Sequence, residues 1–71
     1  MSVAIKRMAF KFSIVKKGWN VKQLAEQVPI DYVYLNKIIN GKANPSDLIA
    51  IKISNALEVD VSEIFEIKEK V

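Results

Sequence analysis

Apolar residues recur at helical spacing along most of the chain, and breaker residues divide them into helix-sized segments. Three segments have their apolar residues mainly on one side, which predicts amphipathic helices over residues 21–28, 32–39 and 47–57. The expected inward sides are Leu24, Ala25 and Val28; Leu35, Ile38 and Ile39; and Leu48, Ile49, Ile51, Ile53, Ala56 and Leu57.

Residues that cap helices stand at the expected starts and ends of these segments. Asn20 with Gln23 forms a capping-box pattern, and Asp60 with Glu63 forms another that opens a short helix reaching Phe65. The remaining signals are N-caps at Asp31 and Ser46, and helix ends at Gly18, Pro29 and Asn40-Gly41. Together they predict five helices.

The first segment is apolar on two sides. We predict a helix from about residue 5 to 17 and leave residues 1–4 unassigned, although alternation over residues 8–14 also suits a strand. Such a helix either lies between two layers of core or contacts a partner chain. The two sides are Val3, Phe10 and Ile14, and Ile5, Met8, Phe12 and Val15.

Composition narrows the class of protein. The 71 residues are 51% hydrophobic and 27% charged, which is typical of one small globular domain, here residues 1–71. The chain contains no cysteine and no histidine, which excludes disulfides and removes the commonest general base and metal ligand. No apolar run has the length of a membrane span, and no signal peptide is visible. We therefore expect a cytoplasmic binding module without membrane association, cofactor or enzymatic activity.

Charge is distributed unevenly along the chain. Residues 1–45 contain eight basic and two acidic side chains, a net +6, whereas residues 46–71 contain three basic and six acidic ones, a net −3. This asymmetry predicts a basic surface that binds a polyanion and an acidic end that points away from it. An ordinary solvated surface rich in lysine is the simpler explanation.

Two short helices separated by about three residues outline a helix-turn-helix unit. Residues 18–26 (GWNVKQLAE) and 38–46 (IINGKANPS), with Ala56, Leu57 and Val59 after them, resemble the lambda-repressor-like (Cro/CI, Xre-type) helix-turn-helix family. The resemblance covers about residues 10–65. It implies an all-α, compact five-helix domain of prokaryotic or phage type, whose third helix enters the major groove of double-stranded DNA.

The candidate DNA contacts follow from the outward positions of the third helix and from the resemblance. Val33 suits a thymine methyl group, Asn36 an adenine edge and Lys37 the acceptors of guanine. The expected base contacts are Tyr32, Val33, Asn36 and Lys37, and the expected phosphate contacts are Asn20, Lys22, Tyr34, Asn40 and Lys42. An ordinary exposed helix surface is the alternative for the first set, and simple capping or solvation for the second.

The chain departs from the family pattern at four positions. Val21 replaces a glutamine that bonds DNA in many members, and Pro29 stands where the turn often has glycine. Ile14 and Ile39 replace an arginine and a glutamate that commonly form an ion pair. Because packed hydrophobic residues can substitute for such a pair without loss of stability, we predict contact between Ile14 and Ile39.

The resemblance implies a repressor that binds a two-fold operator as a homodimer. Self-association would use the spare apolar side of the first helix or the C-terminal part, namely Ile64, Phe65, Ile67 and Val71. An alternative is an antitoxin-type module whose acidic C-terminal part binds a protein partner while the domain represses its own operon.

Overall fold

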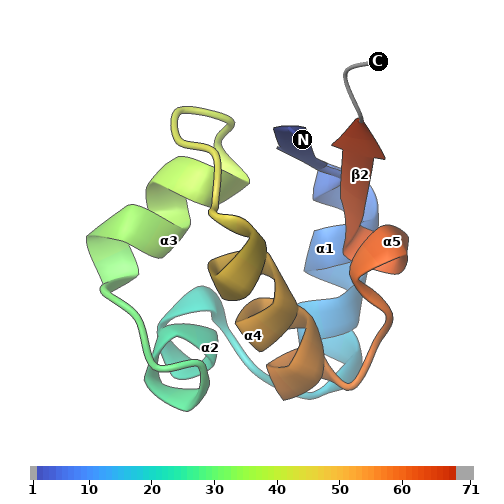
Figure 1. Ribbon diagram of the computed structural model, residues 1–71. Coiled ribbons are helices and arrows are strands. Elements are labelled where there is room, and N and C mark those ends of the chain that lie inside the picture. Colours follow the sequence, from blue (N-terminus) through green and yellow to red (C-terminus); the bar gives the residue numbers. More distant parts are fainter. Residues whose placement is uncertain (1, 69–71) are drawn as a thin grey trace.

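The computed structural model describes residues 2–68, and the side chains of residues 3–66 among them. Five helices enclose one core, with α2 and α3 on one side, α1 and α5 on the other and α4 between them (Figure 1). This mostly helical architecture confirms the predicted five-helix fold. The elements are β1 (Ser2–Ile5), α1 (Arg7–Lys16), α2 (Val21–Gln27), α3 (Tyr32–Ile39), α4 (Asp47–Leu57), α5 (Val61–Ile64) and β2 (Phe65–Lys68).

The predicted N-caps of α2, α3 and α4 are confirmed. In the capping box of α2, Asn20 Oδ1 accepts from the Gln23 amide at 2.8 Å and Gln23 Oε1 accepts from the Asn20 amide at 2.9 Å. The side chains of Asp31 and Ser46 each accept a bond from the amide three residues on, at 3.2 Å. These local bonds satisfy amides that have no partner within the helix, so they fix where each helix begins.

The start of α5 differs from the prediction. The Asp60 carboxylate accepts bonds from the amide and the hydroxyl of Ser62, at 2.9 and 3.0 Å, while the Glu63 amide donates to the Asp60 carbonyl oxygen. Asp60 therefore caps the helix, but the capping box with Glu63 is not the cap observed. The backbone of Phe65 is extended rather than helical, so α5 ends at Ile64.

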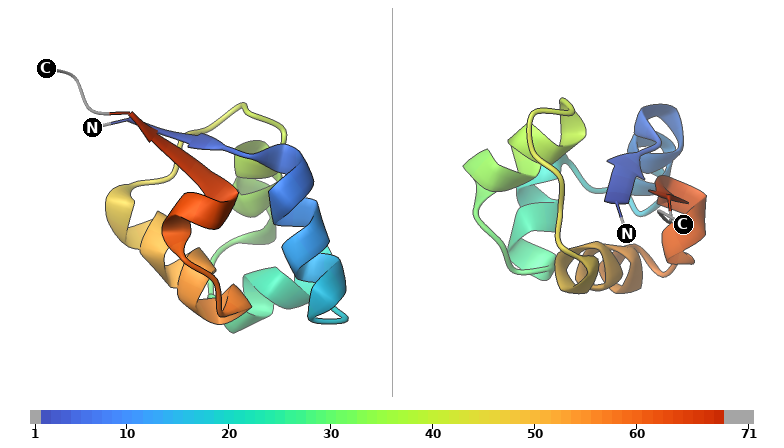
Figure 2. Two further views of the ribbon diagram at one scale, coloured as in Figure 1. Left: turned by 90° about the vertical axis from the view of Figure 1, so that its right-hand side faces the viewer. Right: turned by 45° about the horizontal axis from the view of Figure 1, so that its top comes forward.

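Two short strands close the fold where an all-α domain was expected. β1 and β2 pair antiparallel, with Val3 opposite Ile67 and Ile5 opposite Phe65. The first helix accordingly begins at Arg7 rather than at residue 5. The strands lie side by side although they are some 60 positions apart in the sequence (Figure 2, left). A pattern of local periodicity contains no information about such a distant partner.

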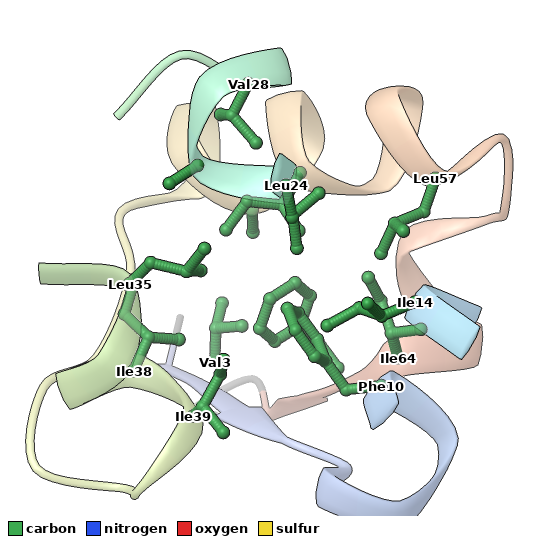
Figure 3. Packing of buried hydrophobic residues seen from close by; sticks show 14 residues of the cluster. Val3, Phe10, Ile14, Leu24, Val28, Leu35, Ile38, Ile39, Leu57 and Ile64 are labelled. Atoms are coloured by element: carbon green, nitrogen blue, oxygen red, sulfur yellow. The ribbon is translucent and has the colours of Figure 1, made fainter. Parts of the chain in front are cut away.

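The core is continuous from β1 to β2. Phe10 and Phe65 meet edge-on, with ring centroids 5.9 Å apart. Ile14 and Ile39 are both buried in the same cluster. Figure 3 labels both residues within this cluster, so they share one core, and the direct contact between them stays a prediction. The other members of the cluster are Val3, Leu24, Ala25, Val28, Leu35, Ile38, Ala50, Ile53, Leu57 and Ile64.

Several apolar residues face solvent, including two on α4 that were expected in the core. Leu48 and Ile51 on α4 are 60% and 48% exposed, because Ala50, Ile53, Ser54 and Leu57 form the buried side of that helix. On α1, the second apolar side is exposed at Met8, Phe12 and Val15, whereas Ile5 lies in β1 and packs partly against the core. In contrast, Ile64 and Phe65, which were expected to be available for self-association, are fully buried. Val71 and the side chain of Ile67 lie outside the described residues.

Candidate nucleic-acid interface

A four-residue turn joins α2 to α3 and holds them against each other. The Val28–Pro29 peptide bond is cis, and the Ile30 amide donates to the Ala25 carbonyl oxygen at 2.9 Å. Pro29 thus occupies a turn built without the glycine that the family often uses. Figure 2, right, shows α2 and α3 together on the side of the molecule opposite to α1 and α5.

The outer side of α3 displays the residues predicted to contact bases. Tyr32 and Val33 are 45% and 57% exposed, Lys37 is exposed and Asn36 is half-buried. They face outward because Leu35, Ile38 and Ile39 anchor the opposite side in the core. We call these four residues the recognition surface. It offers a methyl-bearing side chain, a phenol, an amide and a cation, which together suit the edges of base pairs in a major groove.

The start of α2 presents two of the predicted phosphate contacts. Lys22 is exposed, and so is Asn20. The capping box occupies the side-chain oxygen of Asn20 and the amides of residues 20 and 23. The side-chain amide nitrogen of Asn20 is the group left to donate to a phosphate, so capping and phosphate binding are compatible at this residue.

The other predicted phosphate contacts lie along α3 and just beyond its end. Tyr34 is half-buried against the core. Asn40 Nδ2 donates to the Asn36 carbonyl oxygen at 3.0 Å, a bond that closes the helix end. Gly41 then has a φ of +74°, and the amides of Lys42 and Ala43 both donate to the Lys37 carbonyl oxygen at 2.8 and 3.2 Å. This turn holds Lys42 exposed next to the C-terminal end of α3.

Comparison with known proteins identifies the family. A sequence profile described as helix-turn-helix matches residues 14–64, well over half of the chain and including all of α2, α3 and α4. The chain belongs to the helix-turn-helix family. The domain is of the Xre/Cro-CI type, whose members are DNA-binding regulators rather than enzymes.

Two known proteins resemble this chain, one in sequence and one in fold. The helix-turn-helix domain is 38% identical over 52 residues to HTH-type transcriptional regulator SlrR of Bacillus subtilis (strain 168). That match covers 72% of this chain and 34% of SlrR, so the chain spans about a third of the length of that relative. The crystal structure of the restriction-modification controller protein C.AhdI from Aeromonas hydrophila has the same fold, with a TM-score of 0.73 at 23% identity. The superposition covers 80% of this chain and 86% of that one.

Basic residues lie both on the helix-turn-helix unit and on α1. Lys22, Lys37 and Lys42 lie on or next to α2 and α3, and five further cations between residues 6 and 17 lie on or beside α1. The predicted basic surface stays a prediction. Two of the α1 cations bond to the acidic C-terminal half: Lys6 Nζ donates to the Ser62 carbonyl oxygen and Lys17 Nζ pairs with Glu58 at 2.6 Å.

One residue that sequence reasoning missed contacts α3 directly. Arg7 Nε donates to the carbonyl oxygen of Ile39 at 3.1 Å, between the start of α1 and the last residue of α3. Its position in the sequence gives no periodic or motif signal for this bond.

Among residues 2–68, no helix of this domain has the length and apolar character needed to cross a membrane.

Proposed function

We propose that this protein is a sequence-specific transcriptional repressor that binds a two-fold operator with α3 in the major groove. The observation that supports this most is the recognition surface: Tyr32, Val33 and Lys37 are exposed on the outer side of a helix whose inner side is fixed in the core. In this proposal residues 1–71 act as one DNA-binding domain in the cytoplasm.

The recognition surface reads bases and the residues around it hold the DNA backbone. Val33 contacts a thymine methyl, Asn36 pairs with adenine, and Lys37 donates to guanine N7 or O6, while Tyr32 lies at the entrance to the groove. Contacts to the DNA phosphates come from residues on both sides of the recognition surface and fix the register of the protein on the duplex. They are Asn20 and Lys22 at the start of α2, and Tyr34, Asn40 and Lys42 along and beyond α3.

Binding to a two-fold site requires two copies, and we propose that α4 supplies their contact. Leu48 and Ile51 lie three residues apart on α4 and are both exposed, Ile51 to about half, so they form one apolar strip. Asp47 and Lys52 beside them have opposite charges, which lets a symmetric contact pair unlike charges. The predicted C-terminal residues Ile64 and Phe65 are in the core and do not serve this purpose. For the same reason no partner-binding role is proposed for them.

Selection of bound sequences from random double-stranded DNA tests the DNA-binding proposal. We expect enrichment of a site with two-fold symmetry and half-sites about one helical turn, roughly 34–36 Å, apart. Affinity for that site should fall steeply with salt, and Lys37→Ala with Lys42→Ala should weaken it and flatten the salt dependence. A protein that enriches no sequence, or whose binding ignores salt, does not have the proposed function.

The dimer contact has its own test. Leu48→Asp with Ile51→Asp should give a folded monomer by sedimentation and weaken binding to the full operator more than to a half-site. Phe12→Asp on α1 is the matched control, since it places the same charge on another exposed apolar residue. If the α4 variant has the same oligomeric state and affinity as wild type, the contact lies elsewhere.

A further inference from the structure

The outward side of α1 presents an apolar stripe that the DNA-binding proposal does not use. Met8, Phe12 and Val15 are 83%, 66% and 72% exposed and are spaced four and three residues apart. That spacing places them on one side of the helix. Phe10 and Ile14, on the other side, fix the helix in the core. We call Met8, Phe12 and Val15 the α1 stripe.

On α1 itself, the charged residues beside the α1 stripe are all basic. Residues 6–17 contain five basic side chains and no acidic one. Lys6, Arg7 and Lys17 bond to other elements, as described above. Lys11 and Lys16 are exposed on either border of the stripe, and within the described part of the chain neither has a hydrogen-bond or ion-pair partner.

The molecular surface next to the stripe is hollowed rather than flat. A cavity of about 320 Å³ lies beside Phe12, between α1 on one side and Val59 and α5 on the other. A second hollow of about 150 Å³ continues it and shares Ser13, Lys16 and Val59. Glu63 is the acidic residue that lines the larger one. The α1 stripe forms a ridge and the hollows form a groove beside it, and helices pack by fitting ridges into grooves.

The α1 stripe lies on the side of the molecule away from the recognition surface. In Figure 1 and in the right view of Figure 2, α1 and α3 are on opposite sides of the core, and the stripe is on the side of α1 that faces away from that core. DNA held by α3 would therefore leave the stripe accessible. A ligand of the stripe can bind at the same time as the operator.

Charge decides which occupant fits. A second copy of the chain, docked symmetrically through α1, would place Lys11 and Lys16 against the same cations of its partner, which is unfavourable. DNA would satisfy the lysines but not the exposed Met8, Phe12 and Val15. We propose that the α1 stripe and its flanking lysines form a docking surface for an acidic amphipathic helix of a partner protein. The apolar side of that helix covers the stripe, and its carboxylates pair with Lys11 and Lys16.

Three synthetic peptides of about 18 residues test this proposal on the intact protein. The first is a helix former with leucines on one side and glutamates on both borders of that side. The second has lysines in place of the glutamates, and the third has the first composition in scrambled order. Backbone amide NMR follows each titration. We expect the glutamate peptide to shift resonances of residues 8–16, with affinity falling as salt rises, and the other two peptides to bind at least tenfold more weakly.

Substitutions then locate the contact. Met8→Ser with Phe12→Ser should weaken binding of the glutamate peptide at least tenfold, and Gln27→Ser, at an exposed residue on α2, should not change it. Lys11→Glu with Lys16→Glu should reverse the preference toward the lysine peptide. All these side chains are exposed, and circular dichroism checks that each variant folds.

Four results would overturn the proposal. Two concern the peptides: the glutamate peptide does not bind, or the lysine peptide binds equally well. Two concern the Met8→Ser, Phe12→Ser variant. If this variant no longer forms a dimer, the stripe contacts a second copy of the chain, and if the variant loses affinity for the operator, the stripe contacts DNA. Because the peptide titration needs no operator, the docking surface and the DNA-binding function can fail independently.

Discussion

Arg7 Nε donates a hydrogen bond of 3.1 Å to the carbonyl oxygen of Ile39, the last residue of α3. The bond satisfies a carbonyl that has no partner within its helix and places a cation at the negative end of the helix dipole. Position 39 is the one at which many members of the family have a glutamate paired with an arginine. Here Arg7, about two helical turns before Ile14, bonds the backbone of that position instead, while Ile14 and Ile39 belong to the core.

Replacement of Arg7 by methionine tests whether this bond positions α3. Arg7→Met keeps the apolar stem but removes the donor, and it should cost about 0.5–1.5 kcal/mol of stability. We expect operator affinity to fall several-fold with an unchanged slope of log affinity against log salt. Lys11→Met, on the exposed side of the same helix, is the control and should change stability by less than about 0.5 kcal/mol. A flatter salt slope for Arg7→Met would instead assign Arg7 to a phosphate contact.

Val33 and Lys42 should affect DNA binding in different ways. Val33→Ala removes methyl groups from the recognition surface, so it should relax preference at one base pair in each half-site without changing the salt slope. Lys42→Ala should weaken binding to all sequences alike and reduce the slope by about one. Competition between the selected operator and single-base variants, measured at several salt concentrations, separates the two. Identical behaviour of both variants would contradict the assigned roles.

The parts of the fold that were predicted correctly depend on local interactions. Helices α2, α3 and α4 begin where Asn20, Asp31 and Ser46 cap them, and each cap involves residues within three positions of one another. A sequence pattern contains all of that information. The outward residues of α3 were predicted correctly for the same reason, because the helical spacing of Leu35, Ile38 and Ile39 identifies its inner side.

The parts that were missed depend on distant residues or on competing local bonds. The β1–β2 pair and the Arg7–Ile39 bond each join segments more than 30 positions apart. At α5, the nearer amide and hydroxyl of Ser62 occupy the Asp60 carboxylate in place of the expected capping box. Exposure of Leu48 and Ile51 also escaped prediction, since α4 is rich in apolar residues and its small Ala50 and Ser54 face the core.

The strand pair makes a prediction about stability. Val3 is buried to 5% exposure in β1, whereas its neighbour Ala4 is exposed. Val3→Ala should destabilise the domain by about 1.5–3 kcal/mol, as expected for loss of a buried aliphatic side chain. Ala4→Ser, on the other side of the same strand, should change it by less than about 0.5 kcal/mol. Urea unfolding at neutral pH measures both, and equal effects would mean that β1 does not pack on the core in solution.

Acid should weaken the domain through two carboxylates near α5. The hydrogen bond from Lys17, and then its charge, lower the pKa of Glu58 from the ordinary 4.5. Bonds from the backbone and side chain of Ser62 lower the pKa of Asp60 from the ordinary 3.8. Both carboxyl groups have a lower pKa in the folded state than in the unfolded state. Their contribution to the free energy of unfolding is therefore complete above the ordinary pKa values and is lost as the pH falls through the lowered pKa values. Urea unfolding between neutral pH and pH 3 should show this loss, and Glu58→Gln with Asp60→Asn should reduce it. An undiminished acid dependence in that variant would contradict the assignment.

Glu58 also offers a route to greater stability. It follows α4 with φ of +58°, a left-handed conformation that favours glycine over residues with a Cβ atom. Its side chain pairs with Lys17, which also lies 5.2 Å from the centre of the Trp19 ring, but this pair is exposed to solvent and contributes little. Glu58→Gly should therefore raise the midpoint of thermal unfolding by a few degrees, whereas Glu58→Gln keeps the backbone cost, loses the pair and should leave the midpoint almost unchanged or slightly lower. If Glu58→Gly lowers the midpoint instead, the ion pair outweighs the backbone conformation at this helix end.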